Sequence, residues 1–73
     1  MAQEIVEVPL TGKIISVEVK VGDKVKEGDT LVILESMKME NPIAAPVDGT
    51  VVKISVNKDQ VVKTGDAIAV IEY

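Results

Sequence analysis

The segment with the clearest chemical potential is residues 35–40, Glu-Ser-Met-Lys-Met-Glu, in which one lysine stands between two methionines. A lysine ε-amine can act as a nucleophile or as a point of covalent attachment. Methionine is soft and conformationally adaptable, which suits a surface that other proteins grip in more than one way. Because chemically active residues are scarce elsewhere in the chain, we expect its function to depend on Lys38.

The composition excludes most catalytic classes. The 73 residues contain no His and no Cys, so the usual general base, thiolate nucleophile and soft metal ligand are missing. The 12 acidic residues are scattered and show no metal-ligand spacing such as Asp-x-Asp-x-Asp. We therefore predict no catalytic residue, no metal site and a chain that is not an enzyme by itself.

Charge and hydropathy restrict the partners and the location. A net charge of −4 and the absence of arginine argue against nucleic-acid binding, which needs a positive surface. The N-terminal residues 1–4 include an acid and begin no apolar segment, so we expect no signal peptide. No apolar run approaches the length of a membrane span. The sequence predicts a soluble, cytoplasmic protein that is not inserted in a membrane.

The distribution of aliphatic residues indicates the fold class. The chain has 14 Val and 8 Ile but only 3 Leu, and β-branched side chains favour strands over helices. The length allows one small domain. We predict an all-β fold in which residues 1–73 form a single domain.

The chain also repeats itself with an offset of 37 residues. We therefore predict that residues 9–36 and 46–73 are two copies of one unit, each a strand, a turn, a short strand, a turn and a strand. Two such units facing each other would form a sandwich or flattened barrel with pseudo-twofold symmetry. The identical pairs are Pro9 and Pro46, Gly12 and Gly49, Val19 and Val56, Val25 and Val62, Lys26 and Lys63, Gly28 and Gly65, Asp29 and Asp66, and Glu35 and Glu72.

Period-2 alternation predicts which residues of each unit face the core. Apolar residues alternate with polar ones after Gly12 and again after Gly49, and Gly-Asp pairs mark the turns that follow. The residues predicted to be buried on these strands are Ile15, Val17, Val19 and Val21 in the first copy and Val52, Ile54 and Val56 in the second.

Residues 37–45 join the two copies. The pair Asn41-Pro42 restricts the backbone and prevents helix formation. We therefore expect Lys38 at or beside an exposed hairpin tip, with Met37 and Met39 next to it.

This combination resembles the biotinyl domain of the biotin carboxyl carrier protein family, within the biotin/lipoyl attachment superfamily. The resemblance covers essentially the whole chain, although Ser36 stands where the family usually has alanine. It implies a flattened barrel of two four-stranded antiparallel sheets, with the lysine on a hairpin at one end and both termini at the other. The residues that carry it are Met37-Lys38-Met39, Asn41-Pro42-Ile43, Ala45-Pro46 and Asp48-Gly49-Thr50-Val51.

The resemblance also implies a function. A separate biotin protein ligase would join biotin covalently to the ε-amine of Lys38. The chain would then be a non-catalytic carrier that shuttles carboxyl groups between a biotin carboxylase and a carboxyltransferase or decarboxylase subunit. We assign Met37 and Met39 to orienting the lysine in the ligase and carboxylase sites. We assign Glu35, Ser36 and Glu40 to recognition by the ligase or a partner.

Two alternatives remain beside this reading. A lipoyl carrier shares the fold, but its lysine typically has acidic and small neighbours, as in Asp-Lys-Ala. An unmodified barrel module could mediate assembly, with its lysine incidental. Acetyl-CoA, propionyl-CoA, methylmalonyl-CoA, pyruvate and oxaloacetate systems use biotin carriers of this kind. The chain is compatible with each, either free-standing or as a domain of a longer protein.

Overall fold

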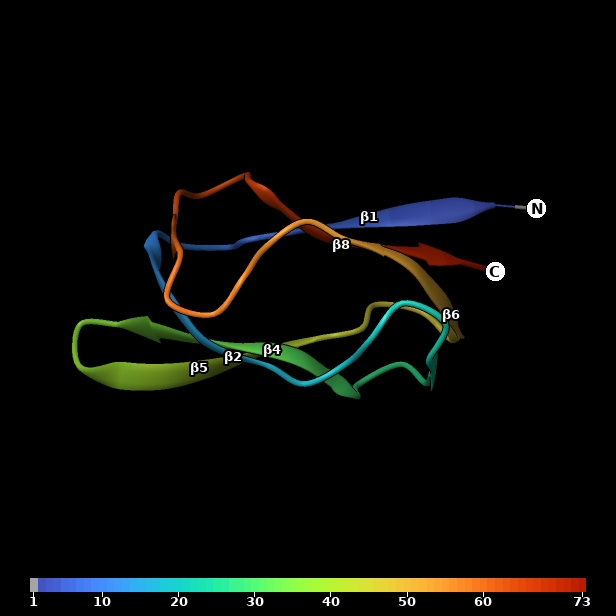
Figure 1. The fold of residues 1–73 in the computed structure, drawn as a ribbon, viewed down its shortest axis with the longest axis horizontal. Coiled ribbons are helices and arrows are strands. Elements are labelled where there is room, and N and C mark those ends of the chain that lie inside the picture. Colours follow the sequence, from blue (N-terminus) through green and yellow to red (C-terminus); the bar gives the residue numbers. More distant parts are fainter. Residues whose placement is uncertain (1) are drawn as a thin grey trace.

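A computed structural model describes residues 2–73, which fold into β-strands joined by turns and loops. The strands form two four-stranded antiparallel sheets, in the orders β1-β8-β6-β3 and β5-β4-β2-β7 (Figure 1). The predicted all-β barrel of two sheets is confirmed. No helix long and apolar enough to cross a membrane occurs among the described residues. The strands are β1 Gln3–Glu7, β2 Gly12–Val17, β3 Lys24–Val25, β4 Thr30–Ser36, β5 Met39–Ala44, β6 Gly49–Ile54, β7 Val61–Val62 and β8 Ala67–Glu72.

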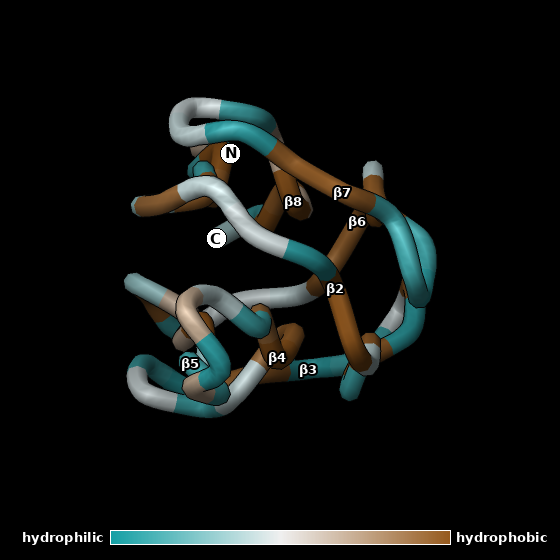
Figure 2. The backbone as a smooth tube through the Cα atoms, turned by 90° about the vertical axis from the view of Figure 1, so that its left-hand side faces the viewer, coloured by the Kyte–Doolittle hydropathy of each residue, from teal (hydrophilic) through white to brown (hydrophobic). Residues whose placement is uncertain are grey.

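The barrel is elongated, with extents of 36 × 18 × 17 Å. The hairpin of β4 and β5 projects from one end of the long axis, and the chain termini lie at the other end (Figure 1). Hydrophobic residues are concentrated in the strands, whereas the connecting turns are mostly hydrophilic (Figure 2). This is the arrangement that the sequence resemblance implied.

The predicted duplication is visible in both the strands and the core. Strands β2 and β6, and likewise β3 and β7, begin and end 37 residues apart, and the two sheets list equivalent strands in the same order. The repeat also extends beyond the predicted copies, because β1 and β5 are equivalent edge strands. Fourteen buried hydrophobic residues form seven pairs at the same offset: Val6 and Ile43, Val8 and Ala45, Ile14 and Val51, Val25 and Val62, Leu31 and Ile68, Val32 and Ala69, and Leu34 and Ile71.

The inward face of the first copy differs from the prediction. Strand β2 ends at Val17, and its register with β4 shifts between Ile14 and Ser16. Ile14 is therefore fully buried, while Ile15 and Val17 are only half-buried. Beyond the strand, Val19 packs at the edge of the core and Val21 is 62% exposed. The prediction that Val21 is buried is wrong, because a β-bulge changes the phase of the alternation and the strand ends early.

The second copy repeats this departure. Its register with β8 shifts between Val51 and Lys53, so Val51 is buried and Val52 is 37% exposed. The prediction that Val52 faces the core is therefore wrong. Ile54 is half-buried against the core, and Val56 is 4% exposed, as predicted.

The turns after β2, β3 and β7 use one device. In each, an aspartate carboxylate accepts a hydrogen bond from the backbone N–H three residues earlier, and the aspartate N–H donates to the carbonyl of that same residue. Such side-chain bonds stabilise tight turns and confirm the predicted Gly-Asp turns. The bonds join Lys20 to Asp23, Lys26 to Asp29 and Lys63 to Asp66. In each, the backbone nitrogen of the lysine lies 2.9 Å from a carboxylate oxygen of the aspartate.

Candidate functional site

The β4–β5 hairpin closes in only two residues. Ser36 pairs with Met39, so Met37 and Lys38 alone form the loop, with φ angles of 54° and 64°. Positive φ at both central positions is the signature of a type I′ turn, whose twist suits a β-hairpin. Such turns favour Asn-Gly, since a larger side chain in this region costs on the order of 1–2 kcal/mol per residue. A turn that holds two long side chains in this conformation is the kind of strain that gathers at functional sites.

The side chains of the turn face solvent. Met37 is 91% exposed and Met39 is 66% exposed, so neither fills a gap in the core. Lys38 is exposed as well. The salt bridge found within residues 2–73 joins Lys13 to Asp59, so no carboxylate of this part of the chain holds the Lys38 amine. The expected exposed tip is confirmed, and its lysine is free to enter another protein.

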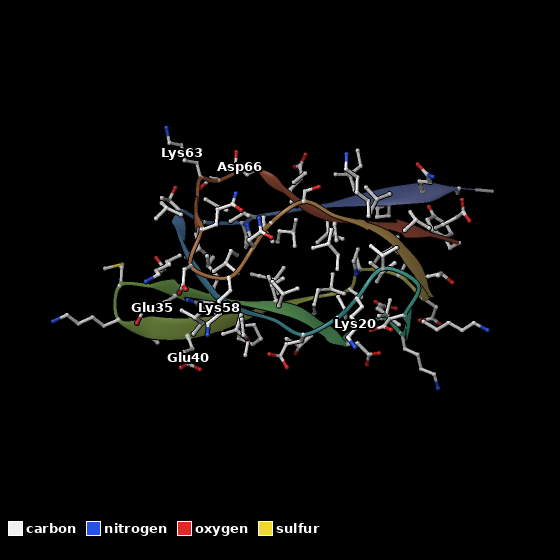
Figure 3. The ribbon with its side chains drawn as sticks, in the orientation of Figure 1. Lys20, Glu35, Glu40, Lys58, Lys63 and Asp66 are labelled. Atoms are coloured by element: carbon white, nitrogen blue, oxygen red, sulfur yellow. The ribbon has the colours of Figure 1, made fainter. Side chains whose placement is uncertain are left out.

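The hairpin has two chemically different faces. Glu35 and Glu40 are direct cross-strand partners, which places like charges opposite each other next to the tip. Both are exposed, and Figure 3 shows them beside the tip, with Lys58 on a loop at the same end of the barrel. Because side chains alternate along a strand, Ser36 and Met39 lie on the opposite face. The tip therefore offers carboxylates on one side and methionine on the other.

Lys13 lies in a row with Glu35 and Glu40 across neighbouring strands, on the outer face of this sheet. It pairs with Glu35 across β2 and β4, and its ammonium lies 3.8 Å from a carboxylate oxygen of Asp59. The ion pair of Lys13 is therefore with Asp59, in the loop between β6 and β7. Among residues 2–73, neither glutamate of the hairpin takes part in a salt bridge.

Asn41 contributes to the site through its side chain, a role that the sequence pattern does not indicate. Its side-chain amide donates hydrogen bonds to the carbonyls of Met39, at 3.1 Å, and Leu34, at 3.5 Å. These bonds tie the first residues of β5 to β4 directly below the turn. Only the strand register reveals this role, because it places Asn41 opposite Leu34. Residues 39–44, expected as part of a connecting segment, instead form the full strand β5.

Gly12 supports the hairpin from below. A Cβ at this position would clash with the carbonyl oxygen of Glu35 and would lie 3.0 Å from Cδ1 of Leu34. Strand β2 can therefore approach β4 this closely only with glycine there. Its counterpart Gly49 has the same relation to Glu72 at the other end of the barrel. The repeat identified both glycines, but the close approach that requires them is a tertiary feature.

The predicted residues 35–40 thus lie together on a hairpin that projects from the barrel. The site has an exposed amine at the tip of the hairpin, flanked by exposed methionine side chains and by a pair of glutamates. An exposed lysine at the tip of a small barrel is the arrangement expected of an attachment domain.

The chain belongs to the family described as "Biotin-requiring enzyme", whose model matches residues 4–71. It is a biotinyl domain, and biotin is the group that this family carries. The residues at the tip fit such attachment, since Lys38 offers an unpaired amine and its neighbours leave it accessible.

Named relatives agree with this assignment. The chain is 60% identical over 42 residues to the methylmalonyl-CoA decarboxylase subunit gamma of Veillonella parvula, which is 58% of this chain and 33% of that subunit. It is 57% identical over 37 residues to the biotin carboxyl carrier protein of Streptococcus mutans, covering 51% of this chain and 28% of that protein. The chain thus spans a third or less of these relatives.

A solved structure extends the agreement to three dimensions. The crystal structure of the Kluyveromyces lactis urea carboxylase matches with a TM-score of 0.92 and 35% sequence identity. The match covers 99% of this chain and 6% of that one. The family description and these relatives favour biotin over lipoate as the attached group.

Proposed function

We propose that Lys38 is the biotinylated residue and that residues 1–73 form one carrier domain of a biotin-dependent carboxylase or decarboxylase. The observation that carries the proposal is the exposed Lys38 on a strained two-residue turn in a chain of the biotin family. The domain itself is non-catalytic and moves carboxyl groups between a biotin carboxylase and a carboxyltransferase or decarboxylase subunit. Its cytoplasmic location stays a prediction from the sequence.

The chain contributes a fixed mount and a flexible arm. Cross-strand pairing from Thr30 to Ala44 and the Asn41 hydrogen bonds hold the backbone of the hairpin. The Lys38 side chain then extends from the tip on a four-carbon stem into solvent. Biotin, once attached, supplies the ureido nitrogen that accepts and donates the carboxyl group. Position comes from the barrel, and the reactive chemistry comes from the attached group.

Recognition by the partners follows from the two faces of the hairpin. Met37 and Met39 flank Lys38 with exposed, adaptable apolar groups that can pack against a biotin protein ligase or a carboxylase. Glu35 and Glu40 face each other, so a basic surface on a partner would relieve their repulsion as it binds. Ser36, opposite Met39, is small enough to let a partner approach the turn closely.

Intact-mass measurement after co-expression with a biotin protein ligase tests the proposal. We expect one added biotin on the parent and none on Lys38→Arg, which keeps the charge and should melt at the same temperature. Lys58→Arg is the matched control, because Lys58 is also exposed at this end of the barrel, and it should be modified normally. Biotin retained on Lys38→Arg would refute the site. A lipoyl mass, or an unchanged parent mass, would refute the carrier assignment.

A further inference from the structure

A groove of about 380 Å³ runs between strands β1 and β5, one from each sheet. Both are edge strands of their sheets. The side chain of Ile5 on β1 is 57% exposed at this groove. The groove is lined by Glu4, Ile5, Val6, Glu7, Pro9, Pro42, Ile43, Ala44 and Pro46.

The pairing of β1 with β8 shows which backbone groups face this groove. Ala2 and Tyr73 exchange two hydrogen bonds of 2.9 Å each, so they form a hydrogen-bonded pair of the ladder. In an antiparallel ladder such pairs alternate with pairs that point their N–H and C=O groups the other way. Gln3 and Ile5 therefore direct these groups away from β8, toward the open edge.

Strand β5 is the symmetry equivalent of β1, but its edge is blocked. Pro42 stands 37 residues after Ile5, in the position whose N–H would point to the open edge. Proline has no N–H, and its presence on an edge strand prevents the addition of another strand. The other edges, β3 and β7, are only two residues long. Among the described edge strands, β1 is the one able to accept a partner strand over several residues.

The charge of the groove indicates what kind of strand fits. Glu4 and Glu7 are among its lining residues, and no lysine lines it. A second copy of the chain pairing through β1 would bring these carboxylates together, which opposes self-association. Lysine or arginine side chains on an incoming strand would instead form favourable cross-strand pairs.

We propose that β1 binds an extended, lysine- or arginine-bearing segment of a partner protein, which adds as a fifth strand to the β1-β8-β6-β3 sheet. Backbone hydrogen bonds to Gln3 and Ile5 supply affinity, as in other cases of strand addition. Glu4 and Glu7 select a basic segment, and Ile5 supplies apolar contact. This docking site is separate from Lys38 and does not require its modification.

Titration of the isotope-labelled protein with a short peptide of alternating Lys and Val tests the proposal by NMR at low salt. We expect the largest amide shifts at Gln3 and Ile5, and binding that weakens as salt is added. The same peptide with Glu in place of Lys should not bind. Removing both carboxylates with Glu4→Gln and Glu7→Gln should weaken binding about fivefold. The matched pair Glu18→Gln and Glu27→Gln, whose side chains do not line the groove, should leave it unchanged.

Two further variants exploit the symmetry of the edges. Ile5→Pro removes the open-edge N–H without removing a bond to β8, so the domain should fold and lose binding, whereas Ile5→Val should keep it. Pro42→Ile restores the missing N–H on β5 and should create a second binding site. Shifts centred on the Lys38 hairpin, equal binding of the acidic peptide, dimerisation through β1, or undiminished binding by a folded Ile5→Pro variant would each overturn the proposal.

Discussion

The two ends of the barrel are equivalent to each other under the internal repeat. Their strands, however, are joined in different ways. At one end Ser36 pairs with Met39, and Met37 and Lys38 bridge them. At the other end Tyr73 pairs with Ala2 through two backbone hydrogen bonds of 2.9 Å, where the chain's two ends meet. Tyr73 lies 37 residues after Ser36, and Ala2 lies 37 residues before Met39.

The difference between the two ends shows which part of the structure supports the site and which part carries its chemistry. The terminal end shows that strand pairing alone holds such a ladder together, without any turn. The pairing of β4 with β5 can therefore impose positive φ on Met37 and Lys38. The duplicated barrel supplies the same mount twice, and the two-residue bridge adds the chemistry to one of them.

The largest loss of stability is expected when a charge is introduced into the core near the hairpin end of the barrel. Val56 is 4% exposed, whereas its counterpart Val19, near the terminal end, is half-buried. Val56→Asp should cost roughly 3 kcal/mol or more, because it buries an unpaired charge in a small domain. Val19→Asp should cost about half as much, since its carboxylate can reach water. Urea unfolding measures both, and two variants that unfold like the parent would contradict the assigned inward face.

The next effect comes from the paired glycines. Gly12→Ala and Gly49→Ala should each cost about 1–3 kcal/mol, because the added Cβ meets the carbonyl oxygen of Glu35 or Glu72. Only Gly12→Ala displaces β4 beside the hairpin, so it alone should lower kcat/KM for biotinylation. Unfolding curves and ligase kinetics measure the two consequences separately. Equal losses of kcat/KM in both variants would mean that stability, and not the position of the hairpin, controls modification.

The sequence predicted the features that depend on local pattern. Valine and isoleucine content indicated the class, the offset of 37 predicted the duplication, and the Gly-Asp pairs marked the turns. Lys38 was identified by its neighbours, and its exposure on a hairpin is confirmed. Each of these signals is carried by residue type and spacing along the chain.

The features that the sequence missed depend on register between strands. The bulges beside Ile14 and Val51 shift the alternation by one residue, and no residue type in β2 or β6 announces them. The repeat alone places residues 39–44 in the segment between the two copies, where Asn41-Pro42 excludes a helix but does not indicate a strand. Only its place on an open edge makes Pro42 compatible with a strand. The Asn41 hydrogen bonds likewise depend on its pairing with Leu34.

A substitution with a smaller expected effect on stability distinguishes backbone strain in the turn from recognition of the turn by the ligase. Met37→Asn replaces a long side chain at φ 54° with a residue that tolerates this conformation. We expect a gain of about 0.5–1 kcal/mol in stability, because the strain is relieved. Ligase kcat/KM should nevertheless fall, since the exposed methionine beside Lys38 is lost. A variant that is both more stable and modified as fast as the parent would remove Met37 from the recognition surface.

The smallest effect is expected at Asp59, and it serves as the control for Met37. Asp59 has φ 72° in the loop between β6 and β7, where the first copy has Gly22 at φ 99°. Asp59→Gly relieves about 1 kcal/mol of strain or less, because aspartate tolerates this conformation, and it adds about 0.5–1 kcal/mol of chain entropy to the unfolded state. It also removes the ion pair between Lys13 and Asp59. The side chains of these residues are 49% and 67% exposed, so the ion pair contributes little to stability. Stability should therefore change by no more than about 0.5 kcal/mol, and ligase kcat/KM should not change. If Asp59→Gly slowed biotinylation as much as Met37→Asn, relief of strain at this end of the barrel would explain both losses, and contact with the methionine side chain would explain neither.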